Sequence, residues 1–269
     1  MTGATGFVGK SLFDVLKCRY SVSLVLRGNT DDFKDANAKF HIGSFSKKTD
    51  FSECVKSIGC VVHLAAKAHK RSNTSLHSIN ELREINTHAT LKLARQAAES
   101  GVRRFVFISS IGVNGTSNTS PFNTLDKPNP IEDYSISKYE AEIGLKEISK
   151  NTGMEVVIIR PPLVYGKNAP GNFGTLLKVA ETKLPLPLGA INNQRSFVAI
   201  DNLVDLIVTC IEHPNAANQT FLVSDDENIS TSNLLKKLTL AAGKKPCLLP
   251  VPISILKFLA SIVGKKSYR

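Results

Sequence analysis

Short apolar runs that alternate with helical patterns constrain the fold of this chain more than any other feature of its sequence. Four runs have the length and composition of buried strands: Val22–Leu26, Cys60–Leu64, Arg104–Ser109 and Glu155–Arg160. The patterns around them predict helices over Phe7–Cys18, Asp50–Ser57, Glu81–Ser100 and Tyr134–Ser149. Strands and helices that alternate over short connections form a parallel, doubly wound α/β sheet, and ligands bind at the carboxyl ends of its strands.

A glycine-rich turn near the start of the chain indicates the ligand. Gly3, Gly6 and Gly9 have the spacing G-x-x-G-x-x-G and lead directly into the first predicted helix. Glycines at such a turn let the backbone approach a pyrophosphate, so a dinucleotide site on a Rossmann-type sheet is predicted. Arg27 ends the next strand, where many such sites place an acidic residue for the ribose 2′-hydroxyl. An arginine there favours NADP over NAD slightly, although a solvated strand-end arginine fits the sequence as well.

The pattern changes after residue 160. Proline and glycine become frequent, which marks loops and a different architecture. We expect a dinucleotide-binding domain over residues 1–160 and a smaller substrate-binding lobe over 161–269, with segments around 197–223 as candidates to return to the first domain. The later elements predicted are helices over Asn202–Glu212, Ser230–Ala242 and Ile253–Val263 and a strand over Thr220–Val223.

Composition narrows the class of protein. Hydrophobic residues make up 42% of the chain and charged residues 21%, as in globular proteins. The five cysteines are scattered, which favours reduced thiols in the cytoplasm over disulfides or a metal site. The net charge of +11 comes from short, dispersed basic groups without aromatic interleaving, so an anionic small substrate is favoured over nucleic acid. No apolar run reaches the ~18 residues needed for a membrane span.

Tyr134 and Lys138 are the candidate catalytic pair. On a helix their side chains lie at i and i+4 on one face. A nearby ammonium lowers the pKa of a phenol from about 10, which would let Tyr134 exchange a proton with an alcohol or ketone. Most pairs with this spacing are ordinary helix-surface residues. The glycine turn and the Ser109–Ser110 pair after a buried strand favour the catalytic interpretation here.

Seven motifs together resemble one family. They are the Thr2–Gly9 turn, His63-Leu-Ala-Ala66, Asn86, Ser109-Ser110, Tyr134-x-x-x-Lys138, Arg160-Pro-Pro and Arg195-Ser-Phe-Val198. In this order they resemble the extended short-chain dehydrogenases/reductases, and within these the nucleotide-sugar epimerase/dehydratase group. The resemblance covers most of the chain.

The resemblance implies roles for individual residues. The catalytic residues would be Ser110, Tyr134 and Lys138. The residues that bind NAD or NADP would be Gly3, Gly6, Phe7, Val8, Arg27, Leu64, Ala65, Ala66, Asn86, Tyr134, Lys138 and Pro161. The residues that contact the nucleotide-sugar would be Ser110, Asn172, Leu188 and Arg195, with Arg195 on the diphosphate; a surface arginine before a strand is the alternative. No metal is implied.

The residues after Ser110 bear on the reaction. Dehydratases of this group carry adjacent acidic residues there, whereas this chain has Ile111 and Gly112, which cannot transfer a proton. Epimerisation at C4 and reduction of a 4-keto sugar remain, and both would use the same residues. The motifs are similar to those of bacterial enzymes that act on UDP-N-acetylamino sugars for surface polysaccharide. A non-catalytic NAD(P)-binding regulator and a reductase of steroid or flavonoid-like ketones are the alternatives.

The sequence departs from the family pattern at both ends. Only Met1 precedes the glycine turn, where the family has a central strand, and the family continues for several dozen residues beyond Arg269. We therefore expect a first strand that is missing, a truncated C-terminus, and weak cofactor binding with little activity. The family also suggests a homodimer through the helices Glu81–Ser100 and Tyr134–Ser149.

Overall fold

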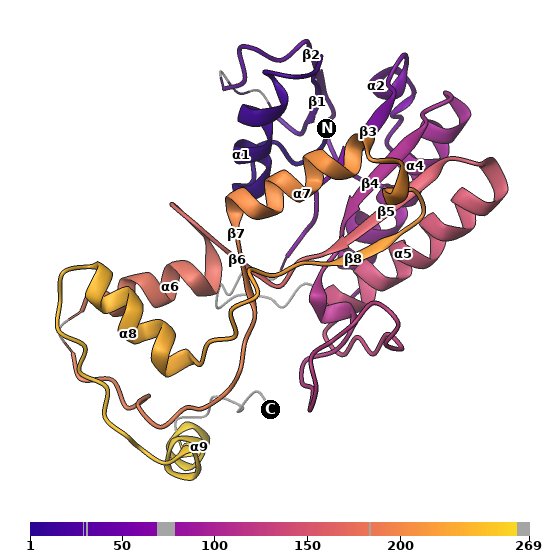
Figure 1. Ribbon diagram of the computed structural model, residues 1–269. Coiled ribbons are helices and arrows are strands. Elements are labelled where there is room, and N and C mark those ends of the chain that lie inside the picture. The colour runs from indigo at the N-terminus through magenta and orange to yellow at the C-terminus, as the bar shows by residue number, and fades with distance from the viewer. Residues whose placement is uncertain (29, 31, 69–78, 183, 263–269) are drawn as a thin grey trace. The chain divides into compact units, whose positions relative to one another are not determined.

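The computed structural model describes residues 1–28, 30, 32–68, 79–182 and 184–262, and the chain divides into two compact units (Figure 1). Unit 1 comprises Met1–Pro162 and Val198–Val223. Unit 2 comprises Leu163–Phe197 and the described part of Ser224–Arg269. The functions predicted for the two parts of the chain stay predictions.

A parallel sheet forms the centre of unit 1. Its strands are β1 (Ser23–Leu26), β2 (Ala38–His41), β3 (Cys60–His63), β4 (Arg104–Ile108), β5 (Glu155–Arg160) and β8 (Thr220–Leu222). β1 pairs with β2, and the other four pair in the order β3-β4-β5-β8, always in parallel. Thr2 forms parallel bridges to Val25 of β1 and to His63 of β3, so it lies between the two groups of strands. The predicted parallel α/β sheet is confirmed.

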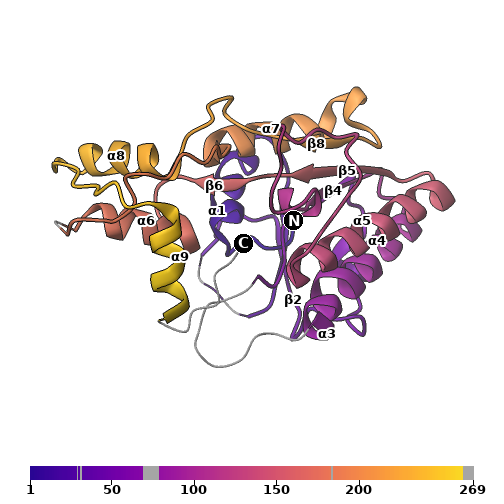
Figure 2. The same cartoon turned by 90° about the horizontal axis from the view of Figure 1, so that it is seen from below.

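Helices cover both faces of this sheet. They are α1 (Phe7–Leu16), α2 (Ser52–Val55), α3 (Ile79–Leu82), the π-helix η1 (Arg83–Ala89), α4 (Thr90–Glu99), the 3-10 turn η2 (Ile111–Val113), α5 (Asp133–Thr152), α7 (Ile200–Glu212) and the 3-10 turn η3 (Pro214–Ala216). α4 packs on α5 on one face, and α1 packs on α7 on the other. Figure 2 shows α7 above β4 and β5, with α4 and α5 below them.

A large group of buried apolar residues lies between the sheet and the α4–α5 pair. It includes Val61, Phe105, Phe107, Val156 and Ile158 from the strands and Leu93, Ala97, Ala141, Leu145 and Ile148 from the helices. At roughly 25 cal/mol per Å² of apolar area removed from water, this burial fixes α5 against the sheet. The face of α5 that carries the candidate catalytic pair is thereby held in place.

The long helix predicted over Glu81–Ser100 is interrupted. The structure has α3, then the wider π turn η1, then α4. π-helical turns occur within α-helices where a side chain needs a position that a regular helix cannot give it. Asn86 lies within η1 and is buried, so this turn directs its side chain into the protein.

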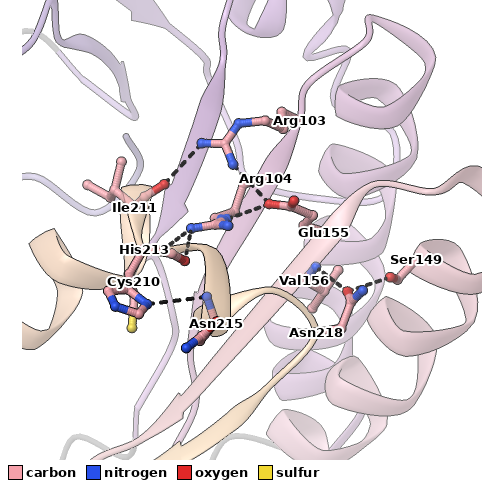
Figure 3. A network of polar contacts seen from close by, with 10 residues as sticks. All are labelled: Arg103, Arg104, Ser149, Glu155, Val156, Cys210, Ile211, His213, Asn215 and Asn218. Carbon is pink, nitrogen blue, oxygen red and sulfur yellow. Dashed lines mark hydrogen bonds and ion pairs between the residues drawn. The ribbon is translucent and has the colours of Figure 1, made fainter.

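Two adjacent arginines hold the amino-terminal end of the sheet to α7 (Figure 3). Nε of the buried Arg104 lies 2.6 Å from Glu155 Oε2, and its Nη1 donates to the carbonyls of Cys210 and His213 at 2.9 and 3.0 Å. The exposed Arg103 donates to the same carboxylate at 3.0 Å. Arg104 therefore binds the carbonyl of Cys210 in the last turn of α7 and that of His213 just after the helix.

Unit 2 consists of short elements. They are β6 (Leu163–Tyr165), α6 (Gly171–Ala180), α8 (Thr231–Ala241) and α9 (Ile253–Ile262), with β7 (Phe197–Ala199) at the point where the chain re-enters unit 1. α6 packs on α8, which buries Phe173, Ala180 and Leu235. α8 begins at Ser230, whose side chain accepts from the N–H of Asn233 as an N-cap.

Candidate active site

Five of the predicted segments meet at one edge of the sheet in unit 1. The glycine turn follows Thr2, Arg27 follows β1, Leu64 follows β3, Ser110 closely follows β4, and Pro161 follows β5. Because all these strands are parallel, their carboxyl ends lie on the same edge. That edge is where ligands bind in open α/β sheets.

The glycine turn has the geometry that a pyrophosphate requires. Gly3 has φ +73°, and a Cβ there would lie 2.7 Å from the backbone N of Ala65. A Cβ on Gly9 would lie 2.1 Å from the carbonyl oxygen of Gly3. Gly6 is exposed and begins α1 without a side-chain cap on the helix N-terminus. The residues present therefore fit a dinucleotide, whose phosphates the N–H groups of the first turn of α1 would meet.

The loop after β3 is held against the glycine turn. Thr2 Oγ1 accepts from the N–H of Ala65 at 3.2 Å and shares a hydrogen bond of 2.7 Å with His63 Nδ1. His63 Nε2 shares another, of 2.9 Å, with Thr90 Oγ1 of α4. The imidazole ring is fully buried between the rings of Phe45 and Phe107, which both stack on it. Residues 64–66 thus have a fixed place beside Gly3.

We expect His63 to make the protein sensitive to acid. Burial, and next to it the charge of Lys138, holds the pKa of His63 well below its usual value of about 6.5. The unfolded chain therefore binds a proton below pH 6.5 that the folded chain does not bind, and stability falls as the pH falls. The expected slope for this one group is about 1.4 kcal/mol per pH unit.

Urea unfolding between pH 5 and pH 7.5 measures this slope. Replacement of His63 by glutamine should remove it, whereas His88→Gln, at an exposed position of η1, should keep it. An unchanged slope in the His63 variant would contradict the assignment.

Tyr134 and Lys138 lie in the first two turns of α5, on one face as predicted. Lys138 is buried, and its Nζ lies 3.9 Å from the centre of the Phe107 ring. Burial lowers the pKa of Lys138 to about 7, while Glu142 acts in the opposite direction. Burial also raises the pKa of Tyr134 to about 12. The lowered pKa expected for Tyr134 is thus not found, because loss of hydration on burial disfavours the charged phenolate.

Ser110 begins the 3-10 turn η2. Its Oγ accepts from the N–H of Gly112 at 3.1 Å, and the side chain is half-buried. η2 packs on the start of α5, where a Cβ on Gly112 would come 2.3 Å from Ser135 Oγ. The structure therefore brings Ser110 to the helix turn that carries Tyr134, and it leaves no room for an acidic side chain at position 112.

Asn86 makes its hydrogen bonds to protein groups. Its Oδ1 accepts from the N–H of Lys67 at 2.8 Å, and its Nδ2 donates to the carbonyl of Lys67 and to Ser137 Oγ, both at 3.0 Å. Ser137 Oγ in turn donates to the carbonyl of Tyr134 at 2.7 Å. Asn86 thus joins the loop after β3 to the first turns of α5. Its direct contact with a cofactor stays a prediction.

Three residues predicted to contact the nucleotide-sugar lie in unit 2. Arg195 is exposed and forms an antiparallel bridge with Ile229. Leu188 is half-buried, and its carbonyl accepts from Ser232 Oγ at 2.5 Å. The side chain of Asn172 lies outside the described residues. The exposed Arg27 and the buried Pro161 belong to unit 1, at the edge described above.

A buried ion pair beside the candidate catalytic residues was not predicted. Glu142 of α5 binds Arg160, the last residue of β5, and also accepts from Ser109 Oγ. From the sequence, Glu142 looks like one of several carboxylates on a helix surface. One available signal was its spacing, because it lies eight residues after Tyr134 and hence on the same helix face.

Comparison with known proteins decides the family. A sequence model of the NAD dependent epimerase/dehydratase family matches residues 1–224. The chain belongs to this family. A curated member, the UDP-glucose 4-epimerase of Vibrio cholerae, is 45% identical over 270 residues, which cover 98% of this chain and 82% of that protein. The N-acetyl-alpha-D-glucosaminyl-diphospho-ditrans,octacis-undecaprenol 4-epimerase of Escherichia coli O157:H7 is 25% identical, over 99% of this chain and 81% of that one.

A solved structure shares the fold of this chain. The UDP-N-acetylglucosamine 4-epimerase from Bacillus cereus superimposes with a TM-score of 0.78 at 20% identity, over 92% of this chain and 82% of that one. At this identity the likeness concerns the fold alone. Among the residues that the structure of this chain describes, no helix is both long and apolar enough to cross a membrane. The same residues contain no group of three or more metal-binding side chains.

Proposed function

We propose that this protein is an NAD-dependent epimerase that inverts C4 of a UDP-sugar. The observation that carries the proposal is the arrangement of Ser110, just after β4, and of Tyr134 and Lys138 on α5, at the edge that also holds the glycine turn. The 45% identity to the UDP-glucose 4-epimerase of Vibrio cholerae, over nearly the whole chain, supports both the reaction and the uridine nucleotide.

Residues of unit 1 would hold the cofactor. The first turn of α1, with Phe7 and Val8, would bind the pyrophosphate, and residues 64–66 would line the adenosine side. Lys138 would bind the nicotinamide ribose, and Pro161 would border the nicotinamide. NAD would supply the acceptor and donor of the hydride exchanged with C4, and in its oxidised form it would add positive charge to the site.

Tyr134 would move the proton. It takes the proton of the C4 hydroxyl when hydride leaves, and returns it when hydride comes back. With a pKa of about 12, the phenol is protonated at neutral pH and needs positive charge nearby to act as a base. Lys138 supplies such charge below its pKa of about 7. Ser110 would donate a hydrogen bond to the C4 oxygen and hold it towards Tyr134.

Dehydration is disfavoured by the same geometry. It needs a side chain that protonates the leaving hydroxyl and another that removes the C5 proton. Ile111 has no proton to transfer, and the space at Gly112 is filled by Ser135 Oγ. The nucleotide-sugar itself would be bound with help from Asn172, Leu188 and Arg195, with the guanidinium of Arg195 on the diphosphate.

Product analysis tests the proposed reaction. The 269-residue chain is incubated with NAD and either UDP-glucose or UDP-N-acetylglucosamine, and the nucleotide-sugars are separated by chromatography. We expect each active substrate to reach an equilibrium with its C4 epimer without net formation of NADH. Steady consumption of NADPH with a UDP-4-keto-6-deoxy sugar, and no epimer from either substrate, would establish a 4-keto reductase instead.

The keto reductase is the second candidate because of Arg27. This exposed arginine directly follows β1, at the sheet edge where the adenosine ribose would lie. We therefore propose that the protein also accepts NADP. Replacement of Arg27 by aspartate should weaken NADPH binding at least tenfold in calorimetry and leave NADH binding within threefold. Equal changes for both cofactors would contradict this role.

We place the protein in the cytoplasm, as a homodimer that supplies nucleotide-sugars for polysaccharide synthesis. The scattered cysteines are in keeping with the compartment, since the structure leaves all five as free thiols. The exposed Ile143 on α5 is in keeping with a partner on that helix. A regulator without catalysis would have no need of the Tyr134–Lys138 pair. A steroid- or flavonoid-type reductase would have no use for Arg195 as a diphosphate-binding residue.

A further inference from the structure

The ion pair between Glu142 and Arg160 is almost wholly buried in unit 1. Their side chains are 1% and 3% exposed. Arg160 Nη2 lies 2.5 Å from Glu142 Oε2, and Arg160 Nε lies 3.0 Å from Oε1, so the contact is bidentate. Such a contact fixes both position and orientation of the two side chains.

Both partners extend the network to the segment that carries Ser110. Ser109 Oγ donates to Glu142 Oε1 at 2.5 Å. Arg160 Nη1 donates to Asn114 Oδ1 at 2.9 Å. Ser109 and Asn114 flank Ser110 and the turn η2, so the segment is tied to the ion pair at both of its ends.

Glu142 also belongs to the helix face that carries the catalytic pair. Tyr134, Lys138 and Glu142 follow one another at intervals of four residues on α5. A shift or rotation of α5 that moved Tyr134 would move Glu142 with it. The ion pair is therefore the joint between two elements that would both contact the C4 oxygen.

A gain in folding stability does not explain this buried ion pair well. Removing two charges from water is costly, and apolar residues of similar volume often replace a buried ion pair without loss of stability. What apolar residues cannot reproduce is the directed set of hydrogen bonds to Ser109, Asn114 and each other. The ion pair is suited to fix the positions of Ser109 and Asn114 relative to α5.

We propose that Glu142 and Arg160 are positioning residues, which set the place of Ser110 relative to Tyr134 and Lys138. This inference rests on the proposed function, in which these three residues act on the same C4 oxygen. A displacement of a reacting group by about 1 Å can lower the rate about 100-fold. Loss of the joint should therefore lower kcat and leave the binding of substrate and cofactor nearly unchanged.

The primary test is the double variant Glu142→Leu with Arg160→Met, which removes both charges at once. We expect kcat to fall at least 30-fold, with KM and the Kd of NAD within threefold of the unmodified protein. Hydrogen–deuterium exchange of residues 109–114 should become at least tenfold faster. A second variant, Ser109→Ala with Asn114→Ala, cuts both ties but keeps the ion pair, so it decides the question if the first does not fold. Its kcat should fall at least tenfold.

The matched control uses a second arginine–glutamate pair, which joins β4 to β5. Arg104 and Glu155 start β4 and β5 at the opposite edge of the sheet, and Arg104 is as buried as Arg160. Arg104→Met with Glu155→Leu should leave kcat of the folded protein within twofold. It should also leave exchange in residues 109–114 unchanged.

The outcomes separate this inference from the proposed function. Values of kcat within threefold of the unmodified protein in both test variants would overturn the positioning role while epimerisation stands. A kcat loss matched by the control would overturn it as well. If the protein epimerises no UDP-sugar, the proposed function fails, and hydrogen–deuterium exchange in the test variants then decides alone. Faster exchange in residues 109–114 supports the positioning role of Glu142 and Arg160, and unchanged exchange overturns it.

Discussion

Replacement of Tyr134 by phenylalanine should lower kcat about 10²- to 10⁴-fold, the range that a positioned acid–base group contributes. The change removes only the hydroxyl, so the ring keeps its place in the first turn of α5. KM for the UDP-sugar should remain within about threefold, because the proton moves during the chemical step and not during binding. Steady-state kinetics with UDP-glucose and its C4 epimer measure both constants.

Tyr139→Phe is the control for this experiment. Tyr139 lies on the same helix and is half-buried, but it lies five residues after Tyr134 and hence on another face of α5. Its variant should keep kcat within twofold. If Tyr134→Phe retains more than about a tenth of the activity, another group transfers the proton and the proposed chemistry is wrong.

Replacement of Arg104 by methionine should lower the free energy of unfolding by about 3 kcal/mol. The change leaves the carbonyls of Cys210 and His213 without the guanidinium, and a hydrogen bond to a charged group contributes about 1.5–3 kcal/mol. Urea unfolding at pH 7.5 measures the loss. The change lies at the sheet edge opposite the candidate active site, so the activity of the folded fraction should not change.

Arg103→Met provides the comparison, since it removes the same charge one residue earlier. The Arg103 side chain is 52% exposed and shares Glu155 as its partner. Exposed ion pairs contribute about 0–1 kcal/mol, so the expected loss is below 1 kcal/mol. Arg103 also donates to the carbonyl of Ile211 in α7 at 3.2 Å, so both variants lose a contact with this helix. Equal losses would show that the burial of Arg104 adds nothing to its contribution.

Much of the fold could be predicted from the sequence because β1, β3, β4 and β5 are apolar and mostly buried. β5 has the predicted bounds, and β1, β3 and β4 differ by one residue. β2 could not be found, since none of its residues is fully buried and no apolar run marks it. α6 begins among glycine and proline residues, which the sequence argument assigned to loops.

The shared helix of Tyr134 and Lys138 was predictable from the sequence, but the electrostatics of the two side chains were not. Spacing alone placed Tyr134 and Lys138 on one helix face. The pKa of Tyr134 depends on burial by segments far away in the chain, and spacing carries no information on that. Glu142 and Arg160 are 18 residues apart, and only the packing of α5 on β5 brings them together.

The π turn η1 limits how this part of the chain can change in length. A turn of this kind holds more residues than a regular helical turn, and here it directs Asn86 towards Lys67 and Ser137. Loss of a single residue from Arg83–Ala89 would restore the regular helix and rotate Asn86 by about 100° away from both. The segment therefore tolerates many substitutions on its outer side but no shortening, and a one-residue deletion would uncouple the loop after β3 from the helix that carries Tyr134.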